Sequence, residues 1–268
     1  MNRIGLLLVR NLKVAVRDRT TILLTILPPL ALVVLGLLTL RWPLAEALVG
    51  AAPARAAAAD AWVFGSAAVL AGFAAGAAVL WRFVDDRRNE RVELFRAGGA
   101  SGWQILGAYG LTLVIVCTAM SLGVIILSQL WALLLGQPVL SAGRWLEILL
   151  GLLLGALFYA ALTGLVATWI TSPGTFGAYC LIGNVTFAFL SLSYGLLGLL
   201  PFAQVAALVR GPLLAPSVSV LQTGDILGTT MPWAGWITAM MLVLWSAVLV
   251  VLAWVRMDRA FEPIPATA

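Results

Sequence analysis

Residues Thr20–Leu40 read TTILLTILPPLALVVLGLLTL, a stretch without a single charged side chain. An α-helix needs about 20 predominantly apolar residues to cross a hydrocarbon core about 30 Å thick, so this stretch predicts a membrane-spanning helix. Pro28 and Pro29 near its middle predict a kink. A cleaved signal peptide is the alternative, because Ala45-Glu46-Ala47 resembles a cleavage site, but the apolar run exceeds the roughly 7–15 residues typical of such peptides.

The composition of the whole chain agrees with that stretch. Of 268 residues, 62% are hydrophobic and 10% are charged, and the mean hydropathy is +1.06, which excludes a soluble globular domain. The chain has no His, and Cys117 and Cys180 lie within apolar runs, so neither a metal site nor a disulfide framework is predicted. We therefore predict no catalytic, cofactor-binding or metal-ligating residue and no enzymatic activity of the chain itself.

Further apolar runs bring the predicted number of transmembrane helices to six. The first span is residues 20–40, and the others are 61–84, 105–135, 148–170, 176–200 and 234–255. The turn signal Thr171-Ser172-Pro173-Gly174-Thr175 separates the fourth span from the fifth. The predicted fold is an all-α membrane protein with one transmembrane domain, residues 1–268, whose even number of spans places both termini on one side.

The basic residues predict which side that is. Twelve of the 16 Lys and Arg lie before the first span, at the end of the second span or between it and the third, or after the sixth, and four lie on the opposite side. Because basic residues near span ends stay in the cytoplasm, we expect both termini to be cytoplasmic in the inner membrane of the cell. The pI of 9.9 then reflects topology, and no nucleic-acid partner is expected.

Residues 1–19 have the pattern of an amphipathic helix. Apolar side chains recur at intervals of four, and basic side chains gather on the other side: Ile4, Leu8, Leu12 and Val16 against Arg3, Arg10, Lys13 and Arg17. Such a helix lies flat on a membrane surface. A plain basic anchor beside the first span is the alternative.

The segment 85–104, DDRRNERVELFRAGGASGWQ, is densely charged in a chain that is otherwise almost free of charge. Its helical pattern from Asn89 to Arg96 is followed by the breaking pair Gly98-Gly99. A short helix of mixed charge suits a protein interface. A solvated hairpin between two membrane helices would also be charged.

Two stretches resemble recurrent signatures of the permease subunits of type-2 ABC exporters: RNLKVAVRDRTTILLTILPPL (Arg10–Leu30) and ERVELFRAGGASGWQILGAYGL (Glu90–Leu111). In that family a connecting helix ends in an Arg-Asp step, here Arg17-Asp18, and a coupling helix follows the second span. The chain departs from the family pattern at Arg91-Val92 and at Ala100.

The resemblance implies a motor that is not in this chain. Cytoplasmic ABC ATPase subunits would bind ATP and magnesium, consistent with the lack of any Gly-x-x-x-x-Gly-Lys-[Ser/Thr] phosphate loop here. A second permease, identical or related, would complete the exporter. The residues implied to couple to the ATPase are Arg10, Arg17, Asp18, Arg87, Arg88, Glu90, Arg91, Glu93 and Arg96. The resemblance also implies a re-entrant helical hairpin at residues 201–233, for which an ordinary loop is the alternative.

The predicted fifth span carries polar and aromatic side chains on one helical face. With Cys180, these substrate-path candidates are Asn184, Phe187, Ser191 and Tyr194. They suit a hydrophobic or amphipathic substrate that is drug-like, lipid-like or a peptide, as in multidrug efflux; packing between helices is the alternative. A non-transport assembly or immunity protein is a second hypothesis for the function. A secondary transporter is disfavoured because the predicted spans contain no Asp, Glu or His.

Overall fold

The computed structural model describes residues 3–48, 50–192, 200–218 and 235–260, and these are helical apart from short connections. The helices are α1 (Arg3–Arg17), α2 (Arg19–Leu35), the π-helix η1 (Gly36–Leu40), α3 (Arg41–Glu46), α4 (Ala52–Arg88), α5 (Arg91–Ala97), α6 (Gly102–Leu134), α7 (Ala142–Trp169), α8 (Pro173–Leu192), α9 (Pro201–Val218) and α10 (Gly235–Ala260). The described part of the chain is therefore all-α.

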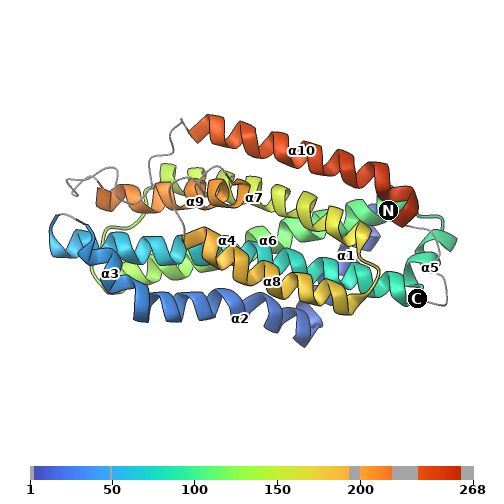
Figure 1. The fold of residues 1–268 in the computed structure, drawn as a ribbon, viewed down its shortest axis with the longest axis horizontal. Coiled ribbons are helices and arrows are strands. Elements are labelled where there is room, and N and C mark those ends of the chain that lie inside the picture. Colours follow the sequence, from blue (N-terminus) through green and yellow to red (C-terminus); the bar gives the residue numbers. More distant parts are fainter. Residues whose placement is uncertain (1–2, 49, 193–199, 219–234, 261–268) are drawn as a thin grey trace.

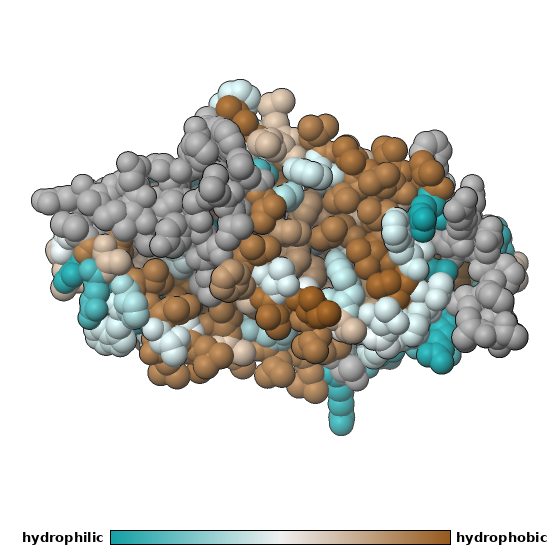
Figure 2. Space-filling model, viewed as in Figure 1, coloured by the Kyte–Doolittle hydropathy of each residue, from teal (hydrophilic) through white to brown (hydrophobic). Residues whose placement is uncertain are grey.

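Six helical stretches in the described ranges are long and apolar enough to cross a membrane: Thr21–Glu46, Ala52–Arg88, Gly102–Leu134, Ala142–Trp169, Pro173–Leu190 and Gly235–Ala253. They lie side by side along the long axis of the molecule (Figure 1). Helices α1 and α5 lie at one end together with the last turns of α10, and α3 lies at the other. Apolar side chains cover much of the middle of the surface, and hydrophilic ones lie mostly toward the ends (Figure 2). The chain is an integral membrane protein.

The start of the second predicted span differs clearly from the structure. Helix α4 begins at Ala52 instead of residue 61, because Arg55 and Asp60 lower the hydropathy of an alanine-rich stretch that still favours a helix. Residues 193–199, near the end of the predicted fifth span, lie outside the described residues, and Leu200 is a bend directly before α9.

Helix α4 forms the centre of the bundle. Residues from Trp62 to Leu80 are all buried, and α2, α6, α7, α8 and α9 pack around them. Small side chains allow this close approach. A Cβ atom added to Gly72 would lie 2.8 Å from Ser121 Oγ, and one added to Gly76 would lie 3.1 Å from Cys117 Sγ. Both glycines therefore pack against α6 of the same chain.

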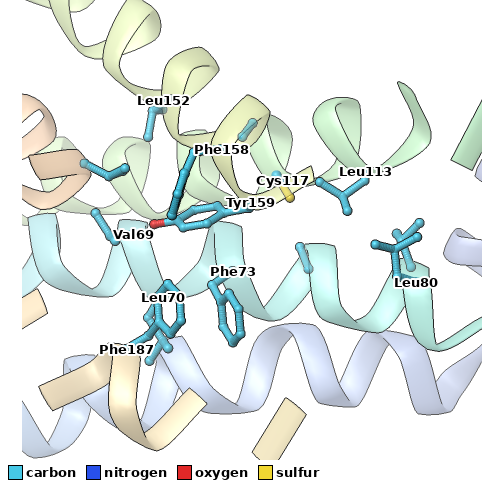
Figure 3. Packing of buried hydrophobic residues seen from close by; sticks show 14 of the residues in the cluster. Val69, Leu70, Phe73, Leu80, Leu113, Cys117, Leu152, Phe158, Tyr159 and Phe187 are labelled. Atoms are coloured by element: carbon cyan, nitrogen blue, oxygen red, sulfur yellow. The ribbon is translucent and has the colours of Figure 1, made fainter. Parts of the chain in front are cut away.

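An aromatic cluster fills the core beside α4. The ring of Phe73 stacks on Phe187 of α8 with the centroids 3.8 Å apart, and Tyr159 of α7 meets both rings edge-on. Figure 3 shows these side chains converging between the three helices. Such pairs add about 0.5–1.5 kcal/mol each beyond the area that they bury.

Helix α9 packs deeply against α4 and α7. A Cβ atom added to Gly155 of α7 would lie 2.6 Å from Val205 Cγ1 of α9, and one added to Gly151 would lie 3.3 Å from Leu208 Cβ. An ordinary loop is therefore wrong for residues 201–218. Residues 219–234, the rest of the predicted re-entrant hairpin, lie outside the described residues, so the hairpin stays a prediction.

Candidate functional site

A buried carboxylate joins four helices at the end of the molecule where α5 lies. Asp86, near the end of α4, has a side chain only 3% exposed. Its carboxylate accepts hydrogen bonds from Arg10 Nη1 of α1 at 2.7 Å, Arg91 Nη1 of α5 at 2.9 Å and Tyr109 Oη of α6. These four residues are called the Asp86 cluster below. Because each donor comes from a different helix, the cluster fixes α1, α5 and α6 to the central helix.

A second ion pair joins α2 to the same part of α4. Asp18 caps α2 by accepting a hydrogen bond from the Thr21 backbone N–H at 2.8 Å, and it pairs with Arg82. Partial burial raises the pKa of Asp18, but the hydrogen bonds from Thr21 and Arg82 outweigh it, so this pKa lies below its usual value. The carboxylate is therefore charged at neutral pH.

Arg10 is held firmly in its charged form. Burial lowers the pKa of its guanidinium, but the hydrogen bond to Asp86 and its charge outweigh this effect, and the pKa is raised. The guanidinium also lies over the ring of Phe95 in α5, 4.9 Å from the centroid. Arg10 thus contacts both the carboxylate of α4 and the inner side of α5.

Helix α5 is anchored on one side and exposed on the other. Val92 is buried in the core, whereas Leu94 is 71% exposed, and Glu93 and Arg96 form an exposed pair at 3.4 Å. Glu90 precedes α5 in the left-handed conformation with φ 56°. Gly99 follows α5 with φ 80° beneath the guanidinium of Arg3, so a side chain there would be strained and would collide with Arg3.

The predicted coupling residues fall into two groups. Three are engaged inside the molecule through the pairs described above: Arg10, Asp18 and Arg91. Arg87 is also turned inward, because its Nη1 donates to the Ala167 carbonyl of α7 at 3.2 Å. The exposed residues on or near α5 and at the end of α1 are Arg17, Arg88, Glu90, Glu93 and Arg96.

Sequence reasoning missed the centre of the cluster. Asp86 and Tyr109 were not among the predicted site residues, and Arg82 was counted only as a basic residue. The one available signal was the pair Asp85-Asp86 at the end of an apolar run. Arg10, on the predicted basic side of α1, is bound to Asp86, and Leu6, Val9 and Val16 of α1 are exposed.

An apolar groove with a volume of about 580 Å³ runs between α2, α4 and α8. Its walls include Leu27 and Leu35 of α2, Ala74 of α4 and Leu181 of α8. Asn184 supplies a polar group, and its Oδ1 is buried without a hydrogen-bond donor among the described residues. The groove can therefore accommodate an apolar molecule that carries a hydrogen-bond donor.

The predicted substrate-facing stripe on the fifth span is divided by the structure. Cys180 and Asn184 line the groove, whereas Phe187 stacks on Phe73 in the core and does not face the groove. The side chain of Ser191 and the whole of Tyr194 lie outside the described residues. Phe187 therefore packs in the core of the bundle.

Trp81 closes the end of the groove nearest α5. It lines the groove, and its indole Nε1 donates to the Pro173 carbonyl at the start of α8 with a length of 3.0 Å. Arg82, the next residue, pairs with Asp18 at the start of α2. Two successive residues of α4 therefore hold the beginnings of both other walls.

Within the described ranges, no three or more His, Cys, Asp or Glu side chains lie together as a metal site would require. No protein-family model matches this chain, and no curated protein matches it either.

Proposed function

We propose that this chain is the permease subunit of an ATP-driven exporter of the ABC type. The observation that supports it best is the construction of α5. Its outer face is exposed in the described part of the chain, and its inner face is tied through the Asp86 cluster to three other helices. A force on α5 would therefore move α1, α4 and α6 together.

The partner is a pair of cytoplasmic ATPase subunits that bind ATP and magnesium. Their closure presses on Glu90, Glu93 and Arg96, and the Asp86 cluster passes the movement to α1. Helix α1 is followed at once by Asp18, which caps α2 and holds it to Arg82. Because α2 is a wall of the groove, this route connects the motor to the proposed substrate path.

The groove carries a hydrophobic or amphipathic substrate, with Asn184 as its hydrogen-bonding contact. A second permease, identical or related, lies beside this chain in the membrane. Helix α1 lies at the cytoplasmic surface of the inner membrane with both termini on that side, and residues 201–233 form the re-entrant segment on the other side.

Purification of the tagged chain from its own membranes in mild detergent tests this proposal. We expect a phosphate-loop ATPase to accompany the wild-type chain and to hydrolyse ATP in lipid. Leu94→Asp places a charge on the outer face of α5 and should remove the ATPase without unfolding the chain. Leu146→Asp is the matched control, since Leu146 is also exposed, at 60%, but lies at the start of α7.

Two results would count against the proposal. One is a wild-type preparation without any ATPase. The other is an ATPase that is lost equally with Leu94→Asp and Leu146→Asp. A partner that binds α5 but hydrolyses no ATP would favour the assembly or immunity protein instead.

A further inference from the structure

A second buried carboxylate lies at the opposite end of α4 from Asp86. Asp60 is 2% exposed and forms an ion pair with Arg41 of α3, Nε to Oδ1, at 2.7 Å. Its Oδ2 accepts hydrogen bonds from Arg41 Nη2 at 3.1 Å, from Trp131 Nε1 of α6 at 3.2 Å and from Gln137 Nε2, after α6, at 3.1 Å. Asp60 thus joins α3, α6 and the segment after α6 to the central helix.

The helix that leads to Arg41 is irregular just before it. Helix α2 passes through Pro28 and Pro29 as an α-helix and changes to the π-helix η1 at Gly36–Leu40. Single π-turns are frequent at functional sites. At the first residue of this turn α2 touches α4 very closely, because a Cβ atom added to Gly36 would lie 2.7 Å from Val63 Cγ1.

Helix α2 and its continuation are therefore fixed to α4 at both ends. The pair Asp18–Arg82 holds the end near α5, and the pair Arg41–Asp60 holds the remote end. Between them lie the residues of α2 that form one wall of the apolar groove, from Leu23 to Leu35. The remote end of the groove cannot widen on the α2 side while Arg41 is bound to Asp60.

The surroundings of Asp60 suit a contact that opens. The Arg41 side chain is 23% exposed, so part of it already reaches the surface. When it leaves, Trp131 and Gln137 still donate to the carboxylate, and a buried charge with two donors is far less costly than an orphaned one.

We propose that Arg41 and Asp60 form a latch that keeps the remote end of the groove closed and that releases when substrate leaves. The inference rests on the proposed function, in which the groove carries the substrate. In the proposed orientation this end faces the outside of the cell.

The latch can be tested without an ATPase and without a known substrate. In a chain with Cys117 and Cys180 replaced by alanine, Leu35→Cys places a thiol in the groove near its remote end. A membrane-impermeant maleimide, added to intact cells, reports whether that end admits water. We expect Asp60→Asn and Arg41→Gln each to raise the labelling rate several-fold.

Two controls separate release of the latch from general loosening. Asp18→Asn breaks the ion pair at the other end of α2 and should leave labelling of Leu35→Cys from outside unchanged. Leu30→Cys, on α2 but not in the groove wall, should label at the same rate in every variant. The inference fails if Asp60→Asn and Arg41→Gln both label Leu35→Cys at the wild-type rate, or if labelling rises equally at Leu30→Cys. Neither outcome would affect the ATPase test above.

Discussion

Asp86 and Glu93 are both acids paired with arginine, yet their surroundings predict different contributions to the stability of the fold. Asp86 is 3% exposed and accepts from two guanidiniums and a phenol. Glu93 is 52% exposed and, among the described residues, pairs with Arg96 three positions away. Exposed pairs contribute about 0–1 kcal/mol to stability, because water screens them. Removing one member of a buried network costs more, because its partners are left buried without their counter-charge.

We therefore expect Asp86→Asn to lower the free energy of unfolding by about 2–3 kcal/mol, allowing for the partial exposure of Arg10 and Arg91. Glu93→Gln should change it by less than about 0.5 kcal/mol. The thermal unfolding of both variants in detergent checks this. Equal midpoints would mean that the Asp86 cluster does not hold the helices together.

Asp18 predicts a dependence of stability on pH. Its folded pKa lies below the unfolded value of about 3.9, so its contribution is present at higher pH and is lost as the pH falls through the folded pKa. The stability difference between wild type and Asp18→Asn should be constant above about pH 5 and should shrink below about pH 4. Unfolding midpoints at a series of pH values test this, and a difference that declines between pH 7 and pH 5 would contradict it.

Asn184 and Phe187 are one helical turn apart but have different surroundings. Phe187→Ala should destabilise the chain by about 3–5 kcal/mol, because its ring is part of the core. Asn184→Ala should leave stability nearly unchanged and weaken binding of a fluorescent long-chain alcohol more than binding of the matching hydrocarbon, which has no donor. The affinities of wild type and Asn184→Ala for the two probes, measured in detergent, test this. If the affinity for the alcohol and for the hydrocarbon fell equally, Asn184 would not contact the ligand.

The sequence predicts which types of residue form the site better than it predicts where each side chain lies in the fold. The basic and acidic residues around α5 were expected to meet a partner, and those on its outer face remain available for one. Arg10 and Arg17 look alike in the sequence, both being arginines on one amphipathic helix. Only the fold shows that Asp86, 76 positions further along, binds the first of them.

At the scale of helices, glycines determine how closely the elements approach. Gly155 and Gly164 lie in the same helix, α7. Gly155 faces Val205 of α9 at contact distance, whereas a Cβ atom at Gly164 would meet no atom of the described residues within 4 Å. The spacing of Gly72 and Gly76 in α4, and of Gly151 and Gly155 in α7, is typical of close helix packing. Their partners, α6 and α9, could not be predicted from this spacing.

Gly155→Ala should therefore destabilise the chain by about 1–3 kcal/mol, because α9 must move outward. Gly164→Ala should be neutral or stabilise it by up to about 1 kcal/mol, since alanine favours the helix. The thermal unfolding midpoints of the two variants, measured side by side, test whether α9 packs against Gly155. A loss that is the same for both variants would show that α9 does not pack at Gly155.

Element boundaries were predictable where composition changes sharply and not elsewhere. The short turn between α7 and α8 follows from Ser172-Pro173-Gly174. The early start of α4 at Ala52 lies in an alanine-rich stretch whose charged residues lower its hydropathy, and no local pattern predicted the π-helix after α2.

At the scale of the whole molecule, the number of long apolar helices was predictable because each must satisfy the length of the bilayer by itself. The arrangement around α4 was not, since it depends on which faces meet. That arrangement places one buried carboxylate at each end of the central helix and the apolar groove between them. A chain built in this way can transmit movement from α5 along α2 to its remote end.

The most direct test of this account asks which protein touches α5. A photo-crosslinking amino acid is introduced at position 94 in living cells, with position 146 as the control, and the attached protein is identified by mass spectrometry. We predict a phosphate-loop ATPase crosslinked at 94 and absent at 146. A crosslink at 94 to proteins without a phosphate loop, or the same ATPase at both positions, would contradict the proposal that α5 receives an ATP-driven motor.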